Sequence, residues 1–388
     1  MREPEGAMPL VDRVQRGVPP CGSTPSEAHL VGLLAEQSPI YAGRSSRDAE
    51  RLRGQLMAGF ETYGLPEAAV PIVIEQLETG IAPYPIAAAA KALRGARDIS
   101  PSVVALLVDC IERLRGCDDV VRFGGETESG APATALIEVL RTIAWLGSRA
   151  AAARADLLVL VKQNPPEFSS AVCAEMEKTL GAIEPPPAEH SCCSLQPATQ
   201  ACCAIAPAPV AVDPAAGMDI VGVELQDQDG EIISFGRLFA GRPSVLSFFY
   251  TRCMNPNKCS LTVSKLARLQ RRLAEDGIAG QINVAAITYD PAFDLPARLA
   301  AYGSHRTMAF DSRNRILRTT GPFAPLQRRF DLGVGYDANV VNQHRLELIV
   351  LDADMRLFAD FSRVSWEIDE LVTTLKRVPS GSLSGAVA

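Results

Sequence analysis

Two cysteines in a short loop carry the clearest chemical signal of this sequence. Cys253 and Cys259 follow an apolar run, residues 244–250, that is typical of a buried strand. They precede residues 261–276, whose apolar positions recur with the spacing of an amphipathic helix. Sulfur atoms at the beginning of a helix feel the positive end of its dipole, which favours the thiolate. The thiolate is the form of cysteine that binds metals and attacks disulfides.

The spacing of the two cysteines restricts how they can meet. Five residues separate them, so they cannot share one helix face as residues i and i+4 do. The loop 254–258 must therefore bulge for the sulfur atoms to approach each other. Two arrangements are open. Either Asn255 and Pro256 cap and begin a helix that places Cys259 one turn in, or Ser260 is the cap and both cysteines lie in the loop.

The elements that would position these cysteines form an alternating pattern of strands and helices. We predict an α/β domain at residues 218–378, followed by a flexible tail at 379–388. The order strand, dithiol loop, helix is that of thioredoxin-like folds. The predicted strands are 221–225, 244–250, 282–287, 346–351 and 357–361, and the predicted helices are 261–276, 296–302 and 366–376.

The preceding part of the chain, residues 46–183, has a helical pattern. Proline recurs near the predicted helix starts and glycine near several ends. Short helices in sequential antiparallel pairs indicate a HEAT-like α-solenoid, and solenoids bind proteins along a concave face, so we expect a protein partner. Residues 1–45 are rich in Pro, Gly and Ser and are expected to be poorly ordered, apart from one short helix at 26–37. The predicted helices are 47–63, 66–78, 85–95, 101–115, 132–147, 150–163 and 167–180.

Composition excludes several classes of partner. The net charge of −7, the pI near 5.3 and the lack of a dense basic run argue against nucleic-acid binding. The polar N-terminus does not resemble a secretory signal, and no apolar stretch is long enough to span a membrane. We therefore expect a cytoplasmic protein, in which ten cysteines favour metal binding, catalysis or burial over a disulfide framework.

Four segments of the C-terminal domain form an ordered set of short motifs. In this order and at these separations they resemble the SCO (SenC) family, a branch of the thioredoxin superfamily. The resemblance implies a copper site of two cysteines and one histidine, here Cys253, Cys259 and His344. It also implies delivery of copper to respiratory oxidase subunits or reduction of their thiols, although the family normally has three residues between its cysteines. The segments are 225–230 with 238 and 241–243, 249–253, 287–294, and 342–344 followed by 348–354.

The donor set allows two kinds of chemistry. Two thiolates suit Cu(I), and an added imidazole also tolerates Cu(II). A dithiol can instead attack a disulfide and resolve the mixed intermediate internally. We therefore predict a copper-handling protein. The alternatives are a thiol–disulfide oxidoreductase or thiol peroxidase, with Cys253 attacking and Cys259 resolving, and a non-enzymatic adaptor.

A second group of thiols lies in the predicted linker, residues 184–217, which is rich in proline and alanine. One interpretation is incidental composition. The other is an auxiliary site for thiol exchange or for a soft metal, with zinc as an alternative to copper. The candidate residues of this auxiliary site are His190, Cys192, Cys193, Cys202 and Cys203.

Overall fold

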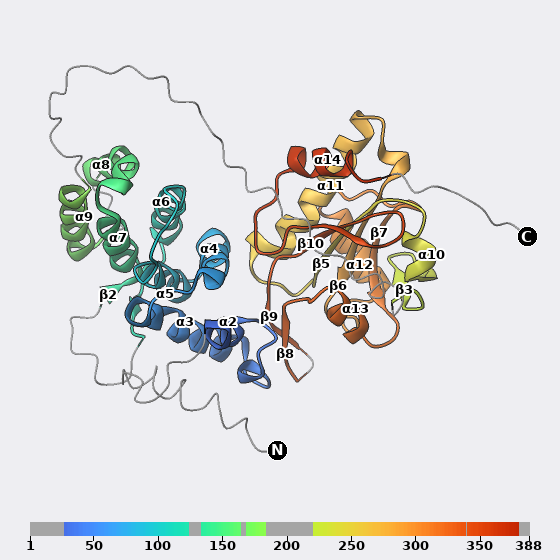
Figure 1. Cartoon of the computed structure of the whole chain (residues 1–388), viewed down its shortest axis with the longest axis horizontal. Coiled ribbons are helices and arrows are strands. Elements are labelled where there is room, and N and C mark those ends of the chain that lie inside the picture. Colours follow the sequence, from blue (N-terminus) through green and yellow to red (C-terminus); the bar gives the residue numbers. More distant parts are fainter. Residues whose placement is uncertain (1–26, 124–132, 164–167, 184–219, 339, 380–388) are drawn as a thin grey trace, which may run out of the picture. The chain divides into compact units, whose positions relative to one another are not determined.

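The computed structural model describes residues 27–123, 133–163, 168–183, 220–338 and 340–379 (Figure 1). Contacts divide the chain into two compact units. One lies within Met1–Ile40 and Arg44–Ile205, and the other within Tyr41–Gly43 and Ala206–Ala388. Among the described residues, no helix is both long and apolar enough to cross a membrane.

The first unit is helical, as the sequence predicted. A small antiparallel pair, β1 (Val120–Val121) and β2 (Ala133–Thr134), was not predicted. The unit includes α2, which begins before the predicted boundary at residue 46 and packs Leu33 and Leu34 into the core. The α-helices are α2 (Glu27–Leu34), α3 (Ser46–Tyr63), α4 (Val70–Thr79), α5 (Pro83–Leu93), α6 (Val103–Leu114), α7 (Ala135–Leu146), α8 (Arg154–Gln163) and α9 (Ser170–Ala182), and the 3-10 helices are η1 (Pro39–Tyr41), η2 (Glu67–Ala69) and η3 (Gly147–Ala153).

The helices of this unit pack as two layers. Helices α3, α5, α7 and α9 contact one another in succession, and α4 contacts α6 behind them (Figure 1). Helix α5 shows why the packing is close. Seven of its eleven residues are alanine or proline, and small buried side chains such as Ala87 and Ala90 let neighbouring backbones approach. The thiol of Cys110 lies in this core.

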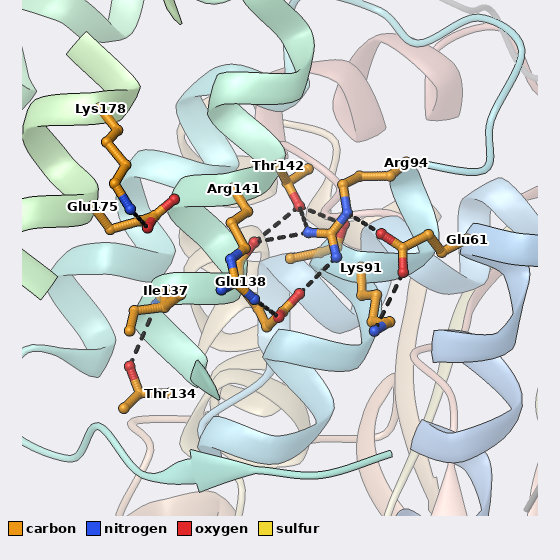
Figure 2. Close-up of polar contacts among 11 residues, drawn as sticks. Glu61, Lys91, Arg94, Thr134, Ile137, Glu138, Arg141, Thr142, Glu175 and Lys178 are labelled. Carbon is orange, nitrogen blue, oxygen red and sulfur yellow. Dashed lines mark hydrogen bonds and ion pairs between the residues drawn. The ribbon is translucent and has the colours of Figure 1, made fainter. Parts of the chain in front are cut away.

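One partly buried guanidinium joins three helices of the unit. Arg94, directly after α5, donates to Glu61 of α3 and to Glu138 and Thr142 of α7 (Figure 2). Its Nε–Oε1 distance to Glu61 and its Nη2–Oε2 distance to Glu138 are both 2.6 Å. The side chain of Glu138 is only 5% exposed, so its charge depends on this partner.

We predict that Arg94→Met destabilises the helical unit by about 3 kcal/mol, because it leaves the Glu138 carboxylate buried without its main partner. Arg141→Met is the matched control. Arg141 contacts the same carboxylate at 2.8 Å but is 44% exposed, so its loss should cost less than about 1 kcal/mol. Urea unfolding measures the free energy of unfolding of both variants, and hydrogen exchange in α5 and α7 locates the loss. Equal losses in the two variants would contradict this account.

The second unit is built on a seven-stranded mixed sheet. Its strand order is β11-β10-β5-β6-β7-β3-β4, with β5, β6 and β7 parallel and the other neighbours antiparallel. A separate hairpin pairs β8 with β9. The strands are β3 (Glu224–Asp227), β4 (Ile232–Ser234), β5 (Ser244–Phe249), β6 (Asn283–Thr288), β7 (Asn314–Thr319), β8 (Val334–Asp337), β9 (Val340–His344), β10 (Leu348–Leu351) and β11 (Leu357–Asp360).

The central strands are buried on both faces, because helices cover each side of the sheet. Along β5, Val245 and Phe249 point into one core, whereas Leu246 and Phe248 point into the other. Helices α11, α12 and α14 contribute to the first core, and α10 and α13 to the second. The helices are α10 (Phe235–Phe239), α11 (Leu261–Glu275), α12 (Pro296–Ser304), α13 (Ala324–Arg329) and α14 (Ile368–Leu375), with a 3-10 turn η5 (Ala279–Gln281).

The sequence pattern did not reveal β7 or the β8–β9 hairpin. Strand β7 carries Arg315 and Arg318 among its apolar residues, which hides the strand pattern. Both arginines have partners on neighbouring elements: Arg315 pairs with Asp227, and Arg318 Nε donates to Gln226 Oε1 at 3.0 Å. Tertiary contacts, rather than local composition, therefore make this segment a strand.

Candidate metal centre

The first cysteine lies just beyond the carboxyl end of β5, the strand between β10 and β6. The loop that carries it is anchored by two aspartates. Asp294 accepts from the Thr251 amide at 3.1 Å and from the Thr251 hydroxyl, and Asp290 forms an ion pair with Arg252. The two aspartates therefore organise this loop. They fix both residues before Cys253, whose thiol is half-buried.

The second cysteine lies in an irregular helical turn, η4 (Pro256–Ser260), that leads directly into α11. The side chain of Asn255 caps this turn by accepting from the Asn257 amide at 2.9 Å. Of the two open arrangements, the structure has the one in which Asn255 and Pro256 begin the turn and Cys259 lies one turn in. The turn is wider than an α-helix, and Lys258 has non-helical backbone angles. This bulge absorbs the long spacing and turns Cys259, 1% exposed, inward.

The histidine reaches the site because of the direction of β10. Strand β10 runs antiparallel to β5, so its first residue, Leu348, pairs with Ser247 near the end of β5. The residues before Leu348 must therefore lie beside the cysteine loop. Ser247 Oγ donates to the carbonyl of Glu347 at 2.7 Å, which locks this alignment. His344, the last residue of β9, is buried there.

The three predicted side chains converge. The Nε2 atom of His344 lies 3.4 Å from the Cys253 sulfur and 3.6 Å from the Cys259 sulfur. All three potential ligand atoms lie within 4.8 Å of one another, and both thiols are free. In the part of the chain that the structure describes, this is the one group of three or more such side chains close enough to share a metal ion.

The hydrogen bond at the far side of the imidazole sets its orientation. His344 Nδ1 lies 3.1 Å from the carbonyl oxygen of Arg345. Because a carbonyl can only accept, Nδ1 carries the proton in this contact. Nε2 then faces both sulfur atoms, where its lone pair would be available to a metal ion. This is the tautomer that a metal-binding histidine needs.

The two thiols differ strongly in acidity. A hydrogen bond from the Cys259 thiol, together with the neighbouring His344, lowers the pKa of Cys253 far below its usual range despite partial burial. Burial, and then the contact with Cys253, raises the pKa of Cys259. The pair therefore has one thiolate at the accessible position and one thiol beneath it. Such a division suits both metal capture and thiol exchange.

Several residues that the sequence analysis did not single out enclose the site. The rings of Tyr250 and Tyr289 lie 5.3 and 5.8 Å from that of His344. Lys258 Nζ donates to the His344 carbonyl at 2.9 Å. Tyr250 and Tyr289 lie within two of the family-like segments and Lys258 lies outside them, but no feature of the sequence indicates that any of the three encloses the site.

The auxiliary thiols of the predicted linker, Cys192, Cys193, Cys202 and Cys203 with His190, lie outside the described residues. Cys110, Cys117 and Cys173 belong to the helical unit. The two-cysteine, one-histidine group of the second unit is therefore the centre that the structure defines.

The second unit is similar to known proteins. Among curated proteins, the domain is similar to a Stutzerimonas stutzeri protein described as a "putative copper-binding protein", with 31% identity over 127 residues. The match covers 30% of this chain and 60% of that protein, so this chain spans less than two thirds of its relative.

Solved structures give similar matches. The SCO1/SenC family lipoprotein of Bacillus anthracis is 20% identical, with a TM-score of 0.34, and the match covers 40% of this chain and 91% of that one. Bradyrhizobium japonicum ScoI with copper bound is 23% identical, with a TM-score of 0.33 and coverage of 40% and 97%. The SCO1/SenC family model matches residues 222–378, which include the sheet, the dithiol turn and His344. The resemblance stated from the four motifs is thereby confirmed, and residues 222–378 of this chain form a domain of the SCO1/SenC family.

Proposed function

We propose that the C-terminal domain binds one copper ion, as Cu(I), through Cys253, Cys259 and His344, and transfers it to another protein. The observation that carries this proposal is the convergence of two sulfur atoms on one imidazole nitrogen, at 3.4 and 3.6 Å. Soft thiolates favour Cu(I), and an imidazole completes a three-donor site. In this proposal copper is the cargo of the protein.

The donor distances fit a metal of this kind. Metal–sulfur and metal–imidazole bonds of about 2.3 and 2.0 Å, at angles between tetrahedral and trigonal, place sulfur and nitrogen roughly 3.5–3.7 Å apart. The two observed distances, 3.4 and 3.6 Å, lie within about 0.2 Å of this range. The site therefore needs little rearrangement to take up an ion.

Relatives support copper over other soft metals. The description of the Stutzerimonas stutzeri relative names copper, and the ScoI structure of Bradyrhizobium japonicum has copper bound. Zinc remains the alternative for the linker cysteines, since closed sulfur-rich sites with four ligands suit it.

We predict that the full chain with Cys192, Cys193, Cys202 and Cys203 replaced by serine binds one equivalent of Cu(I) under reducing conditions. Competition with a chromogenic Cu(I) chelator measures the affinity. Replacing either site cysteine by serine should weaken binding by at least about a hundredfold, because a thiolate ligand is lost. His344→Ala should weaken it less, since the two thiolates remain.

Cys117→Ser is the control for this experiment, because Cys117 is an exposed thiol of the helical unit. It should leave the affinity unchanged. Stoichiometric binding that survives Cys253→Ser would overturn the assignment of the copper site.

The acidity of Cys253 favours a second candidate function, thiol–disulfide exchange. Its thiolate would attack one sulfur of a substrate disulfide and release the other as a thiol. The Cys259 sulfur, within 4.8 Å, would then displace the first substrate sulfur and leave a Cys253–Cys259 disulfide. The two substrate sulfurs are thereby reduced, and the two protein thiols are oxidised.

We predict that Cys253 in the metal-free protein reacts with iodoacetamide at nearly the same rate between pH 5 and pH 8. An ordinary free thiol slows about tenfold per pH unit below its pKa of roughly 8.5, because only the thiolate reacts. The lowered pKa of Cys253 keeps it ionised throughout this range. Peptide mass spectrometry after timed quenching measures the rate. A tenfold fall per unit, as for free N-acetylcysteine, would contradict the inferred thiolate.

For the helical unit we propose a HEAT-like scaffold that docks a protein partner. The support is its packing, in which every second helix from α3 to α9 forms one layer and α4 and α6 pack behind it. This is the order of stacked helix pairs in a solenoid. The cytoplasmic location stays a prediction.

A further inference from the structure

Lys258 connects the two parts of the chain that supply the candidate ligands. It lies in the turn between the cysteines, one residue before Cys259, and its Nζ donates to the His344 carbonyl at 2.9 Å. The link spans 86 residues of sequence, so it is a tertiary contact between the cysteine turn and the end of β9.

The backbone of Lys258 is held on both sides. Its amide donates to the Asn255 carbonyl at 3.2 Å, and its own carbonyl accepts from the Leu261 amide at the start of α11. The side chain therefore extends from a fixed point. Because the backbone of the turn is fixed, the ammonium group of Lys258 can restrain the carbonyl group that it contacts.

The other end of the link is the peptide bond that joins His344 to Arg345. The amide of this peptide donates to the Gly333 carbonyl at 2.9 Å, and its carbonyl accepts from Lys258. Both polar groups of the peptide are thus occupied, which fixes its plane. The fixed plane restrains the backbone at His344, from which the ring extends with Nε2 near the two sulfur atoms.

We propose that Lys258 is a positioning residue that holds His344 and the Cys-x5-Cys turn together as one metal site. This inference rests on the proposed copper function. A five-residue spacing leaves the second cysteine on a wide turn with non-helical backbone angles at Lys258. The lysine compensates by tying that turn directly to the strand that carries the third ligand. In this role it acts through His344.

Lys258→Met keeps most of the side-chain length and removes the donor. It should weaken Cu(I) binding about tenfold, the effect of one charge-assisted hydrogen bond. Lys258→Arg, which restores a cationic donor, should recover most of that loss. Lys376→Met is the matched control. Lys376, which follows α14, contacts Asp276, which follows α11, at 2.8 Å and away from the site. It should leave the affinity unchanged.

A double-mutant cycle separates positioning from plain electrostatic attraction. If Lys258 acts through the imidazole, Lys258→Met should change affinity less than about twofold in a His344→Ala background. The same tenfold loss in both backgrounds would mean that the lysine charge acts on the sulfur atoms, and would overturn the proposal. Unchanged binding in Lys258→Met alone would also overturn it.

A measurement on the metal-free protein tests the contact between Lys258 and the His344 carbonyl, here called the tether, independently of copper binding. In the apo protein, Lys258→Met should accelerate hydrogen exchange in both the 254–261 turn and the 340–347 segment, whereas Lys376→Met should not. If the wild-type chain bound no Cu(I), the copper function would fail while faster exchange still supported the tether. Unaltered exchange in both segments would refute the tether itself.

Discussion

The site depends on one buried carboxylate. Glu347 accepts from the Gly333 amide at 2.7 Å and from Arg345 Nε at 2.6 Å, and it accepts a hydrogen bond from the Tyr289 hydroxyl. Its side chain is 1% exposed, and burial raises the pKa of this carboxyl group. Its backbone carbonyl meanwhile accepts from Ser247 of β5. A single residue thus joins the ends of β5, β6, β8 and β9, and leaving any of its partners unmatched would be costly.

This junction explains why the three candidate ligands meet although 85 residues separate the second cysteine from the histidine. The parallel strand β5 delivers a loop at its carboxyl end, and the antiparallel strand β10 begins at that same end. Any residue just before β10 must then face any residue just after β5. The side chains at these positions, two thiols and an imidazole, determine the chemistry. The directions of the strands bring them close together.

Much of this site could be predicted from the sequence. Cys253 and Cys259 stand between a buried strand and an amphipathic helix, and His344 occupies a position that the family motif marks. Glu347 and Lys258 could not be predicted, since their roles are contacts with carbonyl groups and side chains brought close only by folding. Strand β7 and the β8–β9 hairpin were missed for the same reason: their polar residues find partners across the sheet, so local pattern does not mark them.

The two uses of the dithiol exclude each other. A metal ion needs both sulfur atoms as thiolates, whereas a disulfide removes both from coordination. The acidity difference between Cys253 and Cys259 prepares only one thiolate in the metal-free state, so binding Cu(I) must also release the Cys259 proton. In the proposed functions both uses require the Cys259 proton to leave, so copper and a substrate disulfide would compete for the same reduced pair.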